Sequence, residues 1–217
     1  MTTKVSNYNL FGAPAAGKGT QAEQLAIKFN LVHLAPGNLI KAEIATGSDL
    51  GKRIKPFYDR GDLIPTPDWL AVYARKITAI PATQGVIFDG APRNLEQKAV
   101  FDAMTVELQR PVQNIEIAIS EKESIERQQT RVICEKCGAI YSERLHGIAV
   151  CARCGGKLVK RADATPEAIQ HRMEVYRTET APVIEAYRRD GNMTVVNGEQ
   201  SPESVFQSIL VAINGNH

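Results

Sequence analysis

A glycine-rich segment at residues 11–26, FGAPAAGKGTQAEQLA, limits the possible folds of this chain more than any other feature. A weak strand is expected over residues 4–11 before the glycines, and a helix over residues 18–29 after the first of them. A loop that runs from a strand into a helix presents backbone N–H groups and the positive end of the helix dipole to an anion. Its glycines let the backbone approach phosphate closely, since a Cβ atom would block the way. The segment therefore predicts a phosphate-binding loop, in preference to an ordinary Gly/Ala-rich turn.

The lysine of this loop, Lys18, is spaced to reach the terminal phosphates of a nucleoside triphosphate. The strict P-loop pattern has Ser or Thr directly after the lysine, whereas Gly19 follows here and Thr20 comes one residue later. The loop is therefore either a degenerate P-loop or a particular sub-type, and the rest of the chain must decide between them.

Strand-like and helix-like segments alternate along the chain. Strands are expected at residues 31–34, 85–90, 114–119 and 193–198, and helices at residues 37–62, 165–191 and 201–213. Pro65 and Pro67 mark a further helix start, and Thr165 followed by Pro166 reads as a capped helix N-terminus. Alternating strands and helices indicate a parallel sheet covered on both faces. The predicted fold class is α/β, with a three-layer α/β/α P-loop core.

Two segments interrupt this alternation, and we expect both to be insertions at the carboxyl ends of strands, where α/β proteins bind ligands. One is the polar, helical stretch at residues 35–64, and the other is the cysteine-containing stretch at residues 127–161. The core then comprises residues 1–34, 65–126 and 162–217.

The four cysteines of the chain form two Cys-x-x-Cys pairs with thirteen residues between them: Cys134 and Cys137, then Cys151 and Cys154. This spacing is typical of a closed, tetrahedral structural site, most simply for Zn²⁺. A flap of about thirty residues buries too little core to fold alone, so a metal can substitute for that core. The alternatives are a zinc ribbon that binds nucleic acid and a redox-active thiol pair.

Bulk charge and hydrophobicity bear on the possible partners. The net charge of +2 gives no electrostatic reason to expect nucleic acid as a partner. The N-terminus has no apolar signal-peptide region, and no apolar run approaches membrane-spanning length. We therefore expect a soluble, cytosolic protein with no membrane partner.

The loop GAPAAGKGTQ resembles that of the nucleoside monophosphate kinases, and above all of the adenylate kinases, in which Gly-Thr follows the lysine. Four further segments resemble adenylate kinase motifs in the same order: FDGAPRNLEQ its Asp-Gly-Phe-Pro-Arg motif, ERQQTRVICEKCGAIY with LVKRAD its metal-carrying lid, HRMEVYRTETAPVIEAY the helix after the lid, and VNGEQSPESV the turn that borders adenine. The resemblance covers almost the entire chain. It implies the reaction ATP + AMP ⇌ 2 ADP, with Mg²⁺ as cofactor, Zn²⁺ in the lid and a monomeric protein.

The resemblance also implies roles for individual residues. The catalytic set would be Lys18, Arg93, Arg131, Arg161, Asp163 and Arg172. The set that binds ATP and Mg²⁺ would be Ala15, Ala16, Gly17, Lys18, Gly19, Thr20, Asp89, Arg127, Arg131, Ile140, Tyr141 and Gln200. The set that binds AMP would be Pro36, Lys41, Asp62, Leu63, Ile64, Gly90, Arg93, Gln97, Arg161 and Arg172. Residues 35–64 would close over AMP as the NMP-binding insertion, and residues 127–161 would close over ATP as the lid.

These residue types suit phosphoryl transfer, which requires two highly charged anions to meet in line and little covalent work from the protein. Arginine stays charged and binds phosphate bidentately. Arg93 would hold the α-phosphate of AMP, and Arg127 would lie flat against the adenine of ATP. Asp89 would hold waters of Mg²⁺, Asp163 would anchor the closed lid, and Gln97 would read the AMP adenine. Lid closure would exclude water, which would otherwise hydrolyse ATP.

Several positions depart from the family pattern, mostly on the acceptor side. Pro36 replaces a Thr hydroxyl, Asn38 replaces an Asp, and Lys41 replaces an Arg that clamps the acceptor phosphate. The other departures are Ala15 for Gly, Ala91 for Phe, Thr130 for Gly, Ala164 for Asp and a shortened spacing between the cysteine pairs. We expect a working phosphotransferase with weakened or altered acceptor recognition. The alternatives are another nucleoside monophosphate as acceptor and a low-activity regulatory protein that binds adenine nucleotides.

Overall fold

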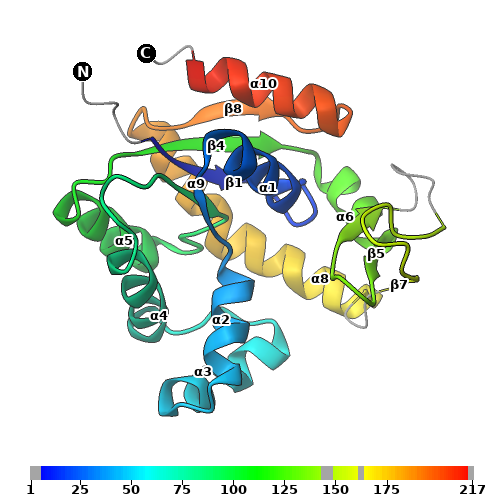
Figure 1. Cartoon of the computed structure of the whole chain (residues 1–217), viewed down its shortest axis with the longest axis horizontal. Helices are drawn as coiled ribbons and strands as arrows, with labels where there is room; N and C mark the ends of the chain where they lie inside the picture. The colour runs from blue at the N-terminus through cyan, green and yellow to red at the C-terminus, as the bar shows by residue number, and fades with distance from the viewer. Residues whose placement is uncertain (1–5, 143–148, 161–163, 215–217) are drawn as a thin grey trace.

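The computed structural model describes residues 6–142, 149–160 and 164–214. Its centre is a five-stranded sheet in the order β2-β3-β1-β4-β8, in which every neighbouring pair is parallel (Figure 1). The strands are β1 (Asn7–Phe11), β2 (Val32–Leu34), β3 (Val86–Asp89), β4 (Val112–Ala118) and β8 (Thr194–Asn197). The register pairs Leu10 with Asp89, which places the carboxyl end of β3 beside the start of the phosphate loop.

Helices cover both faces of this sheet, because successive side chains of each strand point to opposite faces. On one face, Leu10 of β1 packs in a cluster with residues of α1 (Lys18–Phe29) and α10 (Pro202–Asn214). On the other face, Phe11 packs with residues of α9 (Ala181–Arg189). A third cluster joins β2 and β3 to α4 (Thr66–Thr78) and α5 (Leu95–Glu107). The predicted three-layer α/β/α fold is confirmed.

The first insertion forms a pair of helices, α2 (Pro36–Ala45) and α3 (Asp49–Arg60), and not one continuous helical stretch. The break falls at Gly47, whose φ of 70° is left-handed, and Ser48 then caps α3 by accepting a hydrogen bond from Gly51 N. A Cβ atom at Gly51 would lie 2.6 Å from the carbonyl oxygen of Glu43, so this glycine lets the two helices pack closely. The pair projects from one edge of the sheet (Figure 1).

The cysteine segment forms a small antiparallel sheet in the order β6-β5-β7, after helix α6 (Glu121–Gln129). Its strands are β5 (Arg131–Cys134), β6 (Ile140–Ser142) and β7 (Leu158–Lys160). The cysteine segment therefore folds as a small antiparallel ribbon.

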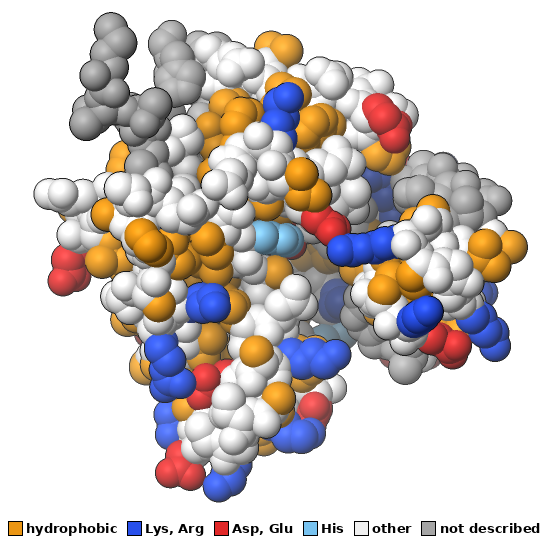
Figure 2. All heavy atoms as spheres, in the orientation of Figure 1, with side chains coloured by type: hydrophobic (Ala, Val, Ile, Leu, Met, Phe, Trp, Pro, Cys, Tyr) orange, Lys and Arg blue, Asp and Glu red, His pale blue; other side chains and the backbone are white. Residues whose placement is uncertain are grey.

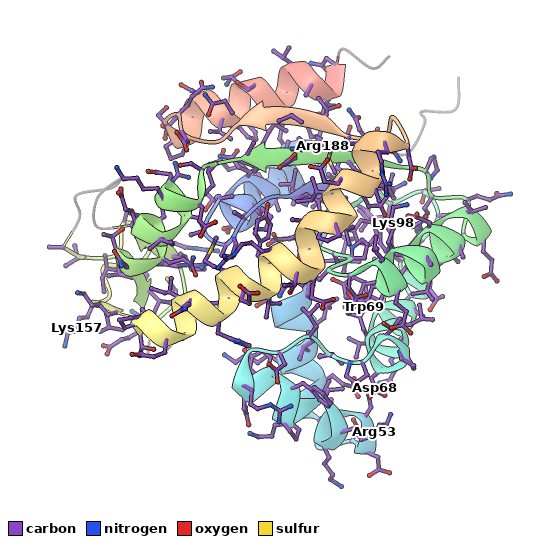
Figure 3. All side chains as sticks on the ribbon, turned by 180° about the vertical axis from the view of Figure 1, so that it is seen from behind. Arg53, Asp68, Trp69, Lys98, Lys157 and Arg188 are labelled. Atoms are coloured by element: carbon purple, nitrogen blue, oxygen red, sulfur yellow. The ribbon has the colours of Figure 1, made fainter. Side chains whose placement is uncertain are left out.

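The helical run after the cysteine segment is longer than any other in the described chain and contains one irregular turn. It consists of α8 (Pro166–Val175), the π-turn η1 (Tyr176–Thr180) and α9. Thr165 accepts a hydrogen bond from Ala168 N (3.2 Å), so the predicted N-cap is confirmed. The π-turn precedes Pro182, which lacks the N–H that a regular α-helix requires. Figure 3 shows this run from behind, passing from the cysteine segment across the molecule.

None of the described helices is long and apolar enough to cross a membrane.

Candidate active site

The phosphate loop, residues 12–17, joins β1 to α1 at the centre of the sheet. Gly12 has a φ of 145°, and a Cβ atom there would lie 2.4 Å from the carbonyl oxygen of Ile117. Gly17, with a φ of 97°, is the N-cap of α1. Because Gly17 has no side chain with which to cap the helix, the first N–H groups of α1 remain available to an anion.

Two alanines follow the proline of the loop, and they differ in backbone conformation. Ala15 has a φ of 58°, in the left-handed region that favours glycine, so its replacement of the family glycine falls at a position that needs positive φ. Ala16 is buried and donates its N–H to the carbonyl oxygen of Ala13 (3.1 Å). The loop is thus held in a compact turn with one strained residue.

Lys18 bends back over the loop. Its Nζ donates hydrogen bonds to the carbonyl oxygens of Gly12 (2.9 Å) and Ala13 (2.8 Å). Burial lowers the pKa of Lys18 to about 8; the positive charges of Arg93 and Arg131 also lower it, and the carboxylate of Asp89 opposes the shift. Four predicted site residues, which come from the loop, the region after β3 and the start of β5, therefore interact electrostatically at one place.

Asp89 lies at the end of β3, beside the N-terminus of α1. A Cβ atom added to Gly19 would lie 3.2 Å from Asp89 Oδ2. Glycine at the position where a strict P-loop carries Ser or Thr thus leaves room for this carboxylate, while Thr20 is exposed on α1. On the other side, His33 Nε2 of β2 is 3.5 Å from Asp89 Oδ2. His33 was not predicted as a site residue, since only the β2–β3 pairing brings it here.

The donor set at this point fits magnesium. Mg²⁺ binds carboxylate oxygen and usually keeps several waters. The side chain of Asp89 is 15% exposed and faces the positively charged groups around the phosphate loop. Asp89 is the residue that would hold the hydrated ion beside phosphate.

The four cysteines form one cluster at the tip of the antiparallel sheet. Their sulfur atoms all lie within 4.8 Å of one another, with Sγ–Sγ distances of 3.5 Å for Cys134–Cys154 and 3.6 Å for Cys137–Cys151, and all four are free thiols. Tetrahedral zinc with four thiolates has sulfur–sulfur distances of about 3.8 Å. The cluster therefore fits Zn²⁺.

The surroundings of the cysteines also suit a metal. A Cβ atom at Gly156 would lie 2.9 Å from the sulfur of Cys134, so glycine at this position leaves room for the sulfur atoms. The hydroxyl of Tyr141 lies 3.4 Å from the sulfur of Cys151; this hydrogen bond and the backbone N–H groups of Arg153 and Cys154 lower the pKa of the Cys151 thiol to about 6, whereas hydrogen bonds with the other thiols raise the pKa of Cys154. Thiolates are the form that binds zinc.

The other residues predicted to bind ATP lie on the same side of the molecule as the cysteine segment. Arg127 is buried, and its guanidinium donates to Glu123 Oε1 (2.6 Å) and to the carbonyl oxygen of Gly198 (2.9 Å). The first bond lies within α6, and the second joins α6 to the turn after β8. Gln200 is exposed beyond that turn, and Ile140 is exposed next to Tyr141 on β6. Figure 2 shows this face hollowed between the core and the two insertions, with basic, acidic and histidine side chains around the hollow.

On the acceptor side, Gly90 and Arg93 follow β3. A Cβ atom at Gly90 would lie 3.1 Å from Cε of Lys18, so a residue predicted to bind AMP lies next to one predicted to bind ATP. Arg93 is exposed and donates through Nε to the carbonyl oxygen of Gly90 (3.2 Å). Gln97 is buried; its Oε1 accepts from Arg93 N (2.9 Å), and its Nε2 donates to the carbonyl oxygen of Ile64 (3.4 Å).

The departing residues of the first insertion lie at its beginning. Pro36 is buried at the first position of α2, while Asn38 and Lys41 are exposed on that helix. At the end of the insertion, Asp62 and Leu63 are half-buried. Residues 61–65 connect α3 to α4, and we call them the strap.

Among the remaining predicted residues, Arg161 and Asp163 lie outside the described residues. Arg172 lies on α8, where its Nε donates to the carbonyl oxygen of Ala168 (3.2 Å). A residue that sequence reasoning missed links this helical run to the acceptor side, because Thr180 Oγ1 of the π-turn donates to the carbonyl oxygen of Arg93 (3.0 Å). The sequence contains Thr-Ala-Pro at this point, but it does not indicate a contact with Arg93, because the two residues are 87 positions apart.

Comparison with known proteins agrees with this geometry. The sequence profile described as adenylate kinase matches residues 10–192. The adenylate kinase of Desulfitobacterium hafniense (strain DSM 10664 / DCB-2) is 34% identical over 212 residues, which cover 96% of this chain and 98% of that protein. The adenylate kinase of Chlamydia felis (strain Fe/C-56) is 35% identical over 206 residues (95% and 96%). That of Geobacillus sp. (strain WCH70) is 34% identical over 213 residues (96% and 99%).

Proposed function

The chain belongs to the adenylate kinase family, and from that premise we propose that it catalyses the reversible, Mg²⁺-dependent transfer of the terminal phosphoryl group of ATP to AMP, giving two molecules of ADP. It is a phosphotransferase. One observation carries the proposal for its active site: Lys18, Asp89, Arg93 and Arg131 interact electrostatically at the phosphate loop.

The chain's own groups would bind, orient and neutralise the two nucleotides. The N–H groups at the start of α1 and the ammonium of Lys18 would hold the phosphates of ATP. Arg93 would hold the phosphate of AMP, and Arg131, Arg161 and Arg172 would surround the transferring group, each offering a charged fork that suits phosphate oxygens. Mg²⁺ held through water by Asp89 would neutralise and orient the phosphates of ATP.

The nucleoside portions would be bound farther out. Arg127, Ile140, Tyr141 and Gln200 would border ATP, and Leu63, Ile64 and Gln97 would border AMP. Arg127 already has two partners, Glu123 and Gly198, so its guanidinium plane is fixed before any nucleotide arrives. That fixed plane supports the stacking role proposed for it.

We assign the core to residues 1–34, 65–126 and 162–217, the NMP-binding insertion to residues 35–64 and the lid to residues 127–161. The four-cysteine cluster would hold a structural Zn²⁺ in the lid, and Asp163 would anchor the lid when it closes. The resemblance to the family further implies a cytoplasmic monomer whose partners are ATP, AMP and ADP, with no nucleic acid and no membrane.

A coupled assay tests this proposal. ADP formation is measured with ATP and Mg²⁺ against a panel of nucleoside monophosphates, for the wild-type protein and Lys18→Ala. We expect turnover with AMP and loss of turnover in the variant. Turnover only with another monophosphate would reassign the acceptor, and nucleotide binding without any turnover would overturn the enzymatic assignment.

A further inference from the structure

The strap and the helix α8 are joined by a contact that spans 109 residues of sequence. His171 Nε2, on α8, lies 3.1 Å from Asp62 Oδ1. Asp62 ends the first insertion, and His171 directly precedes Arg172. The contact therefore joins the end of the acceptor insertion to helix α8 of the core.

The strap is built to present Asp62 to this histidine. Gly61 ends α3 in a left-handed conformation, with a φ of 78°, and Asp62 N donates to the carbonyl oxygen of Phe57 (3.0 Å). Arg60 Nε donates to the second carboxylate oxygen of Asp62 (2.7 Å), which leaves Oδ1 directed to His171. The imidazole also approaches the turn itself, since a Cβ atom at Gly61 would lie 4.0 Å from His171 Cδ2.

Beyond this contact, the strap and the helical run are separated by a hollow. A cavity of about 310 Å³ is lined by Asp62, Leu63 and Ile64 on the strap side and by Val175, Thr178 and Glu179 on the other. Apolar packing does not fill this space, so on this side the strap is held to the helical run by the Asp62–His171 pair, while on its other side Ile64 is buried in the hydrophobic core.

The strap in turn leads to groups that face the acceptor. Ile64 is buried, and its carbonyl oxygen accepts a hydrogen bond from Gln97 Nε2 (3.4 Å). Gln97 Oε1 accepts from the backbone N–H of Arg93 (2.9 Å). A shift of the strap would therefore be passed to the residues proposed to hold the base and the phosphate of AMP.

We propose that His171 is a positioning residue for the acceptor nucleotide: it holds the strap against α8 through Asp62 and thereby strengthens AMP binding. The inference rests on the function proposed above. It assigns His171 no contact with substrate.

The carboxylate side of the contact is charged. The hydrogen bond from Arg60 lowers the pKa of Asp62, and His171 lowers it further, so the carboxylate is ionised at neutral pH. Asp62 can therefore accept hydrogen bonds from Arg60 and His171 at the same time, one on each oxygen.

The expected effect is moderate, since the side chains of His171 and Asp62 are 45% and 33% exposed. Exposed pairs contribute little, so the loss of this one should raise the KM for AMP about threefold at pH 6. The KM for ATP and kcat at saturating AMP should change by less than about 1.5-fold, because the contact does not touch the phosphate loop.

The test compares wild type, His171→Gln and His171→Lys at pH 6. For His171→Gln the KM for AMP should be about three times the wild-type value, and His171→Lys should restore tight AMP binding. A His171→Gln KM equal to that of the wild type, or one that His171→Lys does not restore, overturns the proposal.

Two controls isolate the pair. Arg53 Nη2 and Asp68 Oδ1, 2.7 Å apart, form another ion pair between the insertion and the core, and Figure 3 shows them side by side. Arg53→Gln removes this pair and leaves the Asp62–His171 contact in place, so it shows how much the loss of another ion pair between insertion and core changes the KM for AMP. In an Asp62→Asn background, His171→Gln should have no further effect; a full effect there means that His171 acts through another group.

A readout without catalysis separates this inference from the proposed function. At pH 6, amide hydrogen exchange of a peptide covering residues 58–66 should be faster in nucleotide-free His171→Gln than in the wild type. If this difference is seen but no AMP-dependent ADP is formed by the wild type, the strap contact stands and the proposed function fails. If exchange is unchanged, the strap contact fails whatever the enzyme does.

Discussion

The hydroxyl of Ser124 donates a hydrogen bond of 2.7 Å to the carbonyl oxygen of Pro14, and the serine is fully buried. Pro14 lies in the phosphate loop, and Ser124 lies on α6, the helix that leads into the cysteine segment. The bond therefore connects the helix that leads into the proposed lid to the loop that the lid would cover.

Ser124→Ala should lower the free energy of unfolding by about 1–2 kcal/mol, because the hydrogen bond of a fully buried hydroxyl is lost. A looser loop should also raise the KM for ATP by about three- to tenfold and leave the KM for AMP almost unchanged. Urea unfolding and initial-rate kinetics measure both. Ser208→Ala, which removes an exposed hydroxyl on α10, is the control. Equal KM values for ATP in the two variants would show that the bond does not order the loop.

Ala15→Gly should stabilise the protein. With a φ of 58°, Ala15 occupies a conformation that is unfavourable for a residue with a Cβ atom, and glycine relieves this by about 1–2 kcal/mol. The greater flexibility of glycine in the unfolded chain offsets part of the gain, so we expect a net increase of about 0.5–1 kcal/mol in the free energy of unfolding. Ala16→Gly in the same loop should instead destabilise, because Ala16 is buried and is not left-handed. Destabilisation by both changes would contradict the assignment of strain to Ala15.

The stability of the nucleotide-free protein should depend on Lys18 at alkaline pH. Burial lowers the pKa of Lys18 to about 8 in the folded state, below that of an unfolded lysine. Between pH 8 and pH 10 the unfolded chain therefore binds more protons than the folded one, so the Lys18 contribution to stability rises with pH. The difference in unfolding free energy between wild type and Lys18→Met should shift in favour of the wild type by about 1–3 kcal/mol over this range.

Urea unfolding of both proteins at pH 7.5 and pH 10 measures this shift. Lys28→Met, on the exposed side of the same helix, serves as the control. A constant difference between wild type and Lys18→Met across the range would mean that the folded protein binds the Lys18 proton as tightly as the unfolded chain does.

The parts of this structure that were predictable from sequence are those specified by local chemistry. The strand, glycines and lysine of residues 11–26 predicted the loop, Thr165 predicted a helix start, and cysteine spacing predicted the cluster. The break between α2 and α3 also had a local signal, since Gly47 followed by Ser48 ends one helix and caps the next, but the stretch was predicted only as helical, without this break.

Other features depend on contacts between distant segments. The approach of His33 to Asp89 requires the pairing of β2 with β3, and the Asp62–His171 contact requires the insertion to fold back onto α8. Helix α5 carried no strong apolar periodicity, and its start at Asn94 was not predicted. The replacement of the family glycine by Ala15 could be seen in the sequence. The strain that it causes could not, because strain depends on the backbone angle φ, which a motif does not specify.

Removal of zinc should unfold the cysteine segment before the core. Among the described residues of this segment, the buried apolar side chains are Val132, Cys134 and Cys151, which is too small a core for independent stability. Purified protein should contain one zinc per chain, and a strong chelator should release it. Purified protein that holds less than about a quarter equivalent of zinc, and whose four thiols react freely, would contradict a metal site.

The apo protein should keep the secondary structure of its core but lose protection from proteolysis at residues 131–160, because the metal that substitutes for a hydrophobic core in this segment would be missing. Catalysis should fall with the metal, since Arg131 lies on β5 and moves with this sheet, and added zinc should restore both properties. Limited proteolysis, circular dichroism and the coupled assay on the same samples follow these changes. Full activity in zinc-free protein would show that the cysteine cluster does not support the position of Arg131, and would separate the metal from the chemistry at the phosphate loop.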